Sequence, residues 1–195
     1  MTDEIEEDAD AEFQVREVFA YYGRAAYAAS CVETGLTIAL MQAELMLQVH
    51  GRAQRERKAP SRAEWEAMFD AYMAKHHLLP LGTLIDRFRS VLKVDAQLDA
   101  LLEEALRRRN FIAHGFFRER AIAFAHRVGR LAMISELERD HDLFTRTDEA
   151  VQIAVAPIIP KLGIDPEKHR RDIGEISRRL VDDARSSQTD SPYSK

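Results

Sequence analysis

The chain has 195 residues, of which 46% are hydrophobic and 31% are charged, with one cysteine and a net charge of −5. This composition predicts a globular, helix-rich protein, and it excludes an intrachain disulfide and a cysteine-based zinc site. No stretch of about 18 residues is free of charge and the N-terminus is acidic, so we expect a cytoplasmic protein with neither a membrane span nor a signal peptide.

The first half of the chain begins with an acidic segment. Residues 1–11 carry like charges and have little to bury, so we expect a disordered acidic tail. From Val18 to Leu47, apolar residues recur with a mean spacing of about 3.6, the period of a helix. This pattern predicts one long helix, in which Gly35 is a candidate kink. The polar segment 51–60 is then expected to be a loop.

Local signals predict the next two helices. Ser61 with Glu64 three residues later is a capping-box pattern, and it opens a helix that continues through Tyr72. Pro80 interrupts the pattern, and the apolar spacing over residues 81–92 predicts another amphipathic helix.

A third helix follows in this part of the chain. Asp95 is its expected N-cap, because aspartate accepts hydrogen bonds from the free backbone N–H groups of a first turn. Its expected end is His114, because Gly115 is typical of a helix stop.

The last third of the sequence is also helical in pattern. We expect a helix over about 119–144, then a short helix and a turn within residues 150–164. Asp165 and Pro166 resemble an N-cap followed by proline at the first helical position, which predicts a last helix through Leu180.

Together these patterns predict an all-α bundle of five to seven helices. We expect these helices to form a single domain over residues 12–184, followed by a disordered tail over residues 185–195.

The charge of the chain is distributed unevenly. Residues 107–130 contain seven arginines and one acid, so this window carries 7 − 1 = +6 and the rest of the chain carries −11. The acidic balance argues against sequence-blind nucleic-acid binding, whereas the basic window is a candidate contact for an anionic ligand. The candidate RNA-binding residues are Arg107, Arg108, Arg118 and Arg120. For the first two, pairing with Glu103 and Glu104 on a solvated helix face is the alternative.

One arginine of this window occupies an unusual place. On an ideal helix, Arg109 falls within the apolar face formed by residues such as Leu102 and Ile112, while Asn110 and His114 fall on the polar side. An unpaired buried guanidinium is costly, so Arg109 must reach solvent, find an acid or face a second chain. For His114, the alternative to a catalytic role is a structural one, because the helix dipole favours a histidine in the last turn of a helix.

The segment RNFIAH, which is Arg109-Asn110 followed by three residues and His114, resembles the signature of the higher-eukaryote-and-prokaryote nucleotide-binding (HEPN) superfamily. The helical context over residues 13–145 is similar as well. The resemblance implies a HEPN-like bundle, and many members of this superfamily are metal-independent endoribonucleases of toxin–antitoxin or antiviral systems. They commonly dimerise so that two motifs meet in one cleft.

Carried over to this sequence, the resemblance gives His114 the role of general acid and base, Arg109 that of holding the scissile phosphate, and Asn110 that of orienting both. It implies a homodimer, RNA as the substrate, and an antitoxin or another protein as a partner, with no cofactor and no metal. Arg109 and His114 lie about 140° apart on an ideal helix, so they act together only if the helix breaks or a second copy contributes.

The alternative is a non-catalytic helical dimer that binds a partner protein, RNA or a nucleotide. Other constellations give weaker signals. The pair His76-His77 and the run Asp140-His141-Asp142 have metal-ligand side chains without a matching second set, so we expect them in solvated loops.

Overall fold

The computed structural model describes residues 2–163 and, beyond them, residues 165, 167, 168, 171, 172, 174–176, 178, 179 and 182. Every regular element in these residues is helical and none is a strand, which confirms the predicted all-α class. The chain divides into two compact units, Met1–Ala156 and Pro157–Lys195. The predicted single domain over 12–184 crosses this division.

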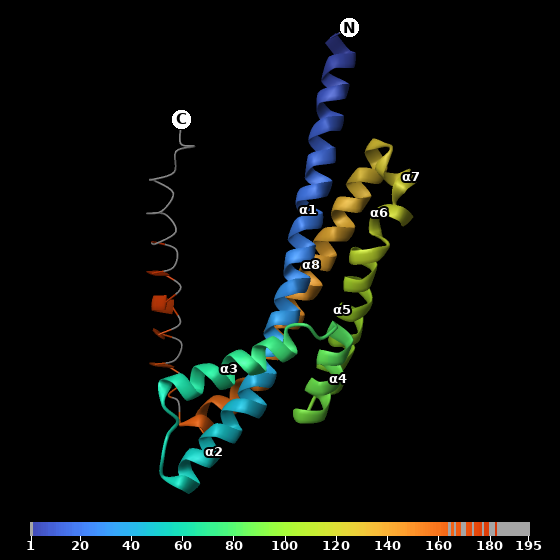
Figure 1. The fold of residues 1–195 in the computed structure, drawn as a ribbon. Helices are drawn as coiled ribbons and strands as arrows, with labels where there is room; N and C mark the ends of the chain where they lie inside the picture. The colour runs from blue at the N-terminus through green and yellow to red at the C-terminus, as the bar shows by residue number, and fades with distance from the viewer. Residues whose placement is uncertain are drawn as a thin grey trace. The chain divides into compact units, whose positions relative to one another are not determined.

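In the described part of the chain, every helix of ten residues or more lies in the first unit (Figure 1). In chain order, the elements are α1 (Thr2–Met41), η1 (Gln42–Met46), α2 (Leu47–Glu56), α3 (Arg62–His76), α4 (Leu81–Val91), α5 (Ala96–His114), α6 (Phe116–Glu119), α7 (Ala121–Phe124), α8 (Arg127–Val155) and η2 (Ala156–Leu162).

The helix α1 forms the centre of the first unit. It runs beside α8 along much of its length and also contacts α3, α4 and α5 (Figure 1). The apolar spacing read from the sequence is the reason, because residues at these intervals share one face of a helix and are buried together. The buried residues of this face include Val18, Ala25, Ala29, Val32, Leu36 and Leu40.

The start of α1 differs from the expectation. The helix begins at Thr2, so it includes the acidic segment 1–11 that the sequence predicts to be disordered. Helix dipoles favour negative charge near an N-terminus, and the first twelve residues carry seven acids. This local preference is a physical reason for the longer helix.

The end of α1 is marked by the π-helix η1 rather than by a kink at Gly35. The extra residue in a π-turn rotates the side chains that follow it out of phase with the preceding helix. Burial along the α1 face accordingly stops at Met41, although the apolar pattern continues to Leu47. Gly35 has a different use, because a Cβ atom at this position would collide with the carboxylate of Asp148 on α8.

The predicted caps of α3 and α5 are confirmed. Ser61 and Glu64 form a complete capping box at the start of α3. Asp95 accepts a hydrogen bond from the backbone N–H of Leu98 at 2.8 Å and opens α5. The helix α5 ends at His114, directly before Gly115, as the sequence predicts.

The predicted helix over 119–144 has different bounds. The chain after α5 forms the two short helices α6 and α7, and α8 starts only at Arg127. The Nδ1 atom of His126 accepts a hydrogen bond from the N–H of Gly129 at 3.0 Å and caps α8. This start is tight, because a Cβ atom at Gly129 would overlap the backbone of Ala123 in α7.

The sequence predicts a short helix and a turn within residues 150–164. The first part of this segment instead extends α8 to Val155, and the 3₁₀-helix η2 follows. Gly163 then adopts a φ of 72°. Asp165 accepts a hydrogen bond from the N–H of Glu167 at 2.9 Å, as an N-cap does. Leu180 and the predicted tail 185–195 lie outside the described residues.

None of the described helices combines the length and the apolar character that a membrane crossing requires.

A pair of glycine substitutions tests the close approach of α7 and α8. We expect Gly129→Ala to lower the free energy of unfolding by about 1–3 kcal/mol, because backbone atoms must move to admit the methyl group. Gly23→Ala is the matched control, since a Cβ atom there has no neighbour within 4 Å. It should raise stability by up to about 1 kcal/mol through helix propensity. Urea unfolding followed by circular dichroism measures both, and equal effects would contradict the tight junction.

Candidate functional site

The predicted site residues lie together in the last two turns of α5. Asn110 and His114 are exposed, whereas Arg109 is half-buried. Among the residues that the structure describes, the imidazole of His114 has no hydrogen-bond or ion-pair partner. The histidine is therefore open to solvent at the end of a helix, where the dipole favours a positive charge.

Arg109 finds an acid within its own chain. Its Nε atom lies 2.7 Å from Oε1 of Glu33 on α1, and the two side chains are 32% and 30% exposed. Its Nη1 atom donates to Oδ1 of Asn110 over 3.4 Å. The contact with Glu33 uses only the Nε atom of Arg109, so the Nη2 atom is not occupied by Glu33. Of the three outcomes open to this arginine, pairing with an acid is the one observed.

The backbone of the motif is held from the α1 side. Carbonyl groups in the last turn of a helix lack partners within the helix. The hydroxyl of Tyr22 on α1 donates to one of these, the carbonyl of Ile112, at 3.2 Å. The aromatic rings around this contact include Tyr22, Phe111, Phe116 and Phe117, at centroid distances from 4.9 to 5.8 Å.

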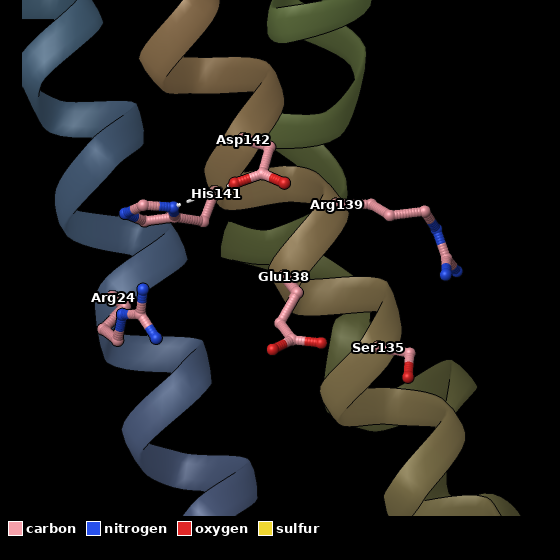
Figure 2. Close-up of a pocket in the computed structure, with 6 residues that line it drawn as sticks. All are labelled: Arg24, Ser135, Glu138, Arg139, His141 and Asp142. Atoms are coloured by element: carbon pink, nitrogen blue, oxygen red, sulfur yellow. Dashed lines mark ion pairs between the residues drawn. The ribbon is translucent and has the colours of Figure 1, made fainter.

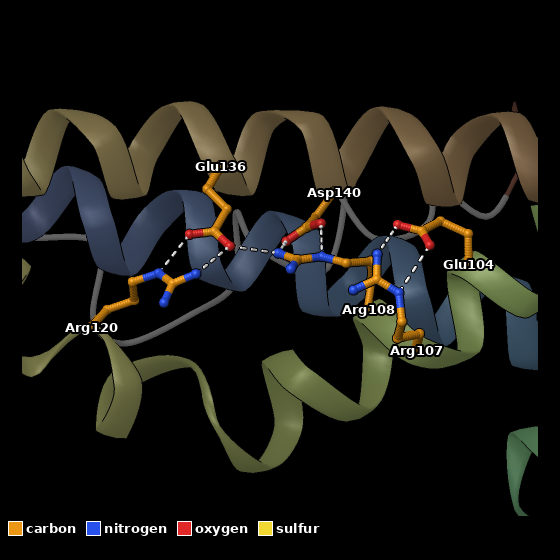
Figure 3. A network of polar contacts seen from close by, with 6 residues as sticks. All are labelled: Glu104, Arg107, Arg108, Arg120, Glu136 and Asp140. Atoms are coloured by element: carbon orange, nitrogen blue, oxygen red, sulfur yellow. Dashed lines mark hydrogen bonds and ion pairs between the residues drawn. The ribbon is translucent and has the colours of Figure 1, made fainter.

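Of the three consecutive arginines 107–109, Arg108 is the most enclosed (Figure 3). Its Nε and Nη2 atoms each lie 2.6 Å from an oxygen of Asp140, and Nη2 also donates to Glu136 at 2.9 Å. Arg120 binds both oxygens of Glu136, at 2.8 and 3.0 Å. The side chains of Arg108 and Asp140 are only 14% and 5% exposed.

This network corrects the alternative for Arg108, which placed it on a solvated face paired with Glu104. It is Arg107 that pairs with Glu104, and its side chain is 65% exposed. Arg108 instead points across the α5–α8 interface (Figure 3). The physical reason is that α5 packs against both α1 and α8, so residues on both edges of its apolar face become enclosed.

The electrostatics of the network favour the charged forms of Arg108, Arg120 and Glu136. The hydrogen bond from Arg108 to Asp140 raises the pKa of Arg108, although burial acts against it. Burial alone would raise the pKa of Glu136, but hydrogen bonds from Arg120 and Arg108 outweigh it and lower that pKa. The ring of Phe111 lies under both guanidinium groups, 4.6 Å from that of Arg108 and 5.1 Å from that of Arg120. The network thus consists of two arginines paired with two acids, with the ring of Phe111 packed against both guanidinium groups.

Each arginine of residues 107–130 has a partner within the chain, which is an acid for all of them except Arg130. Arg118 lies 3.5 Å from Glu119, and Arg127 lies 3.3 Å from Asp10. Arg130 is buried and donates to the side chain of Gln14 and the carbonyl of Phe124. Among the predicted RNA contacts, Arg107 and Arg118 are exposed and that role stays a prediction, whereas Arg108 and Arg120 are engaged by α8.

Of the acids and histidines predicted to lie in loops, His76 and residues 140–142 are on helices, and His77 is in the turn directly after α3. Asp140 is buried in the network, while His141 lies 3.5 Å from Asp142. These last two residues line a depression of about 400 Å³ between α1 and α8 (Figure 2), together with Arg24, Ser135, Glu138 and Arg139. His76 is buried at the end of α3. In the described part of the chain, no three potential metal ligands cluster.

Sequence reasoning missed Glu33, Glu136 and Asp140 as partners of the motif helix. One signal was available, because Glu33 is an acid flanked by buried positions of the first helix, Val32 and Leu36. The partners on α8 gave no such signal, since they lie 28 and 32 residues away from Arg108.

Comparison of the chain with models of protein families, with curated proteins and with solved structures found no match. The resemblance to the HEPN superfamily therefore rests on the Arg109-Asn110-x-x-x-His114 motif and on its helical setting.

Two neighbouring arginines provide a matched test of the network. We expect Arg108→Ala to lower the free energy of unfolding by about 3–5 kcal/mol, because it leaves the buried carboxylate of Asp140 without its main partner. Arg107→Ala should cost less than about 1 kcal/mol, because that ion pair is exposed. Chemical denaturation of both variants measures the difference. Similar, small effects would mean that Asp140 is solvated.

Proposed function

We propose that this protein is a HEPN-like endoribonuclease that cleaves RNA without a metal ion and acts as a homodimer. The observation that supports it best is the arrangement at the end of α5. Asn110 is bonded to Arg109, and the His114 imidazole is exposed one turn further on. The Nη2 atom of Arg109 does not contact Glu33 and is available to a phosphate. An imidazole can transfer protons in phosphodiester cleavage, a guanidinium can bind the phosphate oxygens, and an amide can orient both groups.

The proposed reaction is an internal transesterification. The 2′-hydroxyl of one nucleotide attacks the adjacent phosphorus, so an O2′–P bond forms and the P–O5′ bond breaks. One His114 imidazole accepts the proton of the 2′-hydroxyl, and a protonated imidazole supplies a proton to the departing 5′-oxygen. Arg109 donates hydrogen bonds to the phosphate oxygens as negative charge builds on them. The products are a 2′,3′-cyclic phosphate and a 5′-hydroxyl.

The reaction needs a second copy of the chain for geometric reasons. The helix α5 is continuous through His114, so Arg109 and His114 of one copy point about 140° apart. A twofold axis near the end of α5 would bring the arginine of one copy toward the histidine of the other. Large apolar side chains are exposed on the first unit and would suit such a contact; they include Phe13, Phe19, Tyr27, Ile122 and Val128.

A second candidate function is a non-catalytic helical dimer that binds RNA or a protein partner. The ion pair of Arg109 with Glu33 favours it, because this pair gives the arginine a structural role that needs no substrate. The two candidates differ in one measurable property, which is the cleavage of RNA.

The assembly state is the first requirement of the proposal. We expect sedimentation equilibrium at micromolar concentration to give a mass near twice 22.3 kDa, because exposed apolar surface is buried in the dimer. A monomer across that concentration range would contradict the composite site.

Cleavage of a single-stranded RNA in the presence of EDTA tests the chemistry. We expect wild-type protein to produce fragments that end in cyclic phosphates. His114→Ala should abolish cleavage, whereas His77→Ala, which removes another exposed histidine, should not. Arg109→Ala should slow cleavage by about 10²–10³-fold, the scale for loss of one transition-state donor.

The Glu33→Gln variant distinguishes a catalytic role of Arg109 from a structural one. This variant removes the ion pair but keeps the arginine, so cleavage should persist if Arg109 acts on the phosphate. Circular dichroism confirms that each variant is folded. Intact RNA with the folded wild-type protein would reject the nuclease and favour the binding protein.

A further inference from the structure

The α2–α3 hairpin, which comprises α2, α3 and the connection between them, is unlike the rest of the first unit. No residue of α2 is buried, and the only buried residue of α3 is His76 at its end. Its apolar side chains are instead partly exposed, including Val49, Met68 and Tyr72. Apolar surface of this kind usually marks a binding region.

A cleft of about 710 Å³ lies between the two helices of this hairpin. Its volume is within the range of about 300–1,000 Å³ that small-molecule sites occupy. Apolar side chains form most of its wall: Leu45, Val49, Ala53, Ala59, Pro60, Ala67, Met68 and Ala71. The ten residues of α2 span about 15 Å, so the cleft is long enough for an extended hydrocarbon chain.

The hydroxyl of Tyr72 and the charged groups behind it, at the inner end of the cleft, are paired with one another. Tyr72 lines the cleft, and its hydroxyl donates to Glu44 of η1 at 2.6 Å. Arg87 of α4 also binds Glu44, with both carboxylate oxygens within 2.9 Å of a guanidinium nitrogen. Burial acts to raise the pKa of Glu44, but the hydrogen bonds from Arg87 and Tyr72 outweigh it and lower that pKa. These groups satisfy one another.

The outer end carries one uncommitted charge. Arg52 pairs with Glu56 at 3.1 Å, and Glu64 is held in the capping box with Ser61. Lys58 also lines the cleft, and its ammonium group has no hydrogen-bond or ion-pair partner among the residues that the structure describes. The cleft thus has an apolar interior and a free cation at its mouth.

The backbone fixes Lys58 in this place. Arg57 directly precedes it and adopts the left-handed conformation, with a φ of 50°. The N–H groups of Arg57 and Lys58 both donate to the carbonyl of Ala53, which closes the end of α2. A non-glycine residue in this region is uncommon, and it turns the chain sharply at the mouth of the cleft.

We propose that the cleft between α2 and α3 binds one amphipathic carboxylate with an unbranched hydrocarbon chain. The chain lies against the apolar walls, and the carboxylate meets the ammonium group of Lys58. The match is one of charge and shape, because Lys58, at the mouth, is the one ionic group of the lining that forms neither a hydrogen bond nor an ion pair with a described residue. This site is separate from the motif at the end of α5 and does not depend on the nuclease proposal.

Isothermal titration calorimetry with decanoate, below its micelle concentration, tests the proposal on the full chain. We expect saturable binding with one site per chain. Decan-1-ol should bind at least about tenfold more weakly, because it lacks the charge, and decyltrimethylammonium should not bind.

Two matched pairs of variants locate the site. Ala71→Phe fills the cleft and should abolish binding, whereas Ala74→Phe on the same helix lies outside the lining and should not. Lys58→Glu should weaken decanoate binding by at least about tenfold, and Lys75→Glu should leave it unchanged. Circular dichroism checks the fold, and Ala67→Phe fills the cleft from another position if Ala71→Phe does not fold.

Absence of saturable decanoate binding to the wild-type chain would overturn the proposal. So would equal binding to the Ala71→Phe and Ala74→Phe variants, since the ligand would then lie elsewhere. Equal affinities for decanoate and decan-1-ol would overturn the role of Lys58. Because the readout is heat of binding, each of these results is independent of RNA cleavage.

Discussion

The guanidinium of Arg108, enclosed between α5 and α8, is the constraint on which the candidate site depends. Removing such a charge from water costs several kcal/mol, so the folded chain must supply partners of good geometry. Glu136 and Asp140 supply them from adjacent turns of α8, and Arg120 completes the pairing of Glu136. Because a bidentate contact tolerates little sliding, the network fixes the register of α5 against α8.

That register determines how the end of α5 is presented. Arg109 lies on the edge of α5 that faces α1, where Glu33 holds it, and the contact of Tyr22 with Ile112 fixes the backbone between the motif residues. Asn110 and His114 are left on the outer surface. Most of the positive charge around them is cancelled within the chain. Any recognition of RNA by this surface would therefore depend on a few placed groups rather than on a broad basic field.

Local patterns in the sequence were enough to predict much of the fold. The caps at Ser61 and Asp95 and the end of α5 at His114 depend on neighbouring residues, and each is found where the pattern places it. The π-helix η1 and the break before α8 were not predicted, because both depend on packing against other elements. The α8 start, for example, depends on contact between Gly129 and the α7 backbone.

The candidate site shows the same division between local and distant information. The helical period placed Arg109 within the apolar face of α5, where the structure has it only half-buried, and it correctly left Asn110 and His114 outside. It could not identify which of the arginines 107–109 would be most enclosed, because that depends on which helix packs on each edge of α5. The acids that bind Arg108 are distant in sequence, and Asp140 in particular lies in a polar run that resembles an exposed loop.

A double-mutant cycle between Arg108 and Asp140 tests the central role of this network most directly. Arg108→Met and Asp140→Leu should each destabilise the protein, and the double variant should lose less stability than the sum of the two. We predict a coupling energy of about 2–3 kcal/mol from denaturant unfolding, against less than about 0.5 kcal/mol for the exposed pair Arg107 and Glu104. Additive effects at Arg108 and Asp140 would contradict the account.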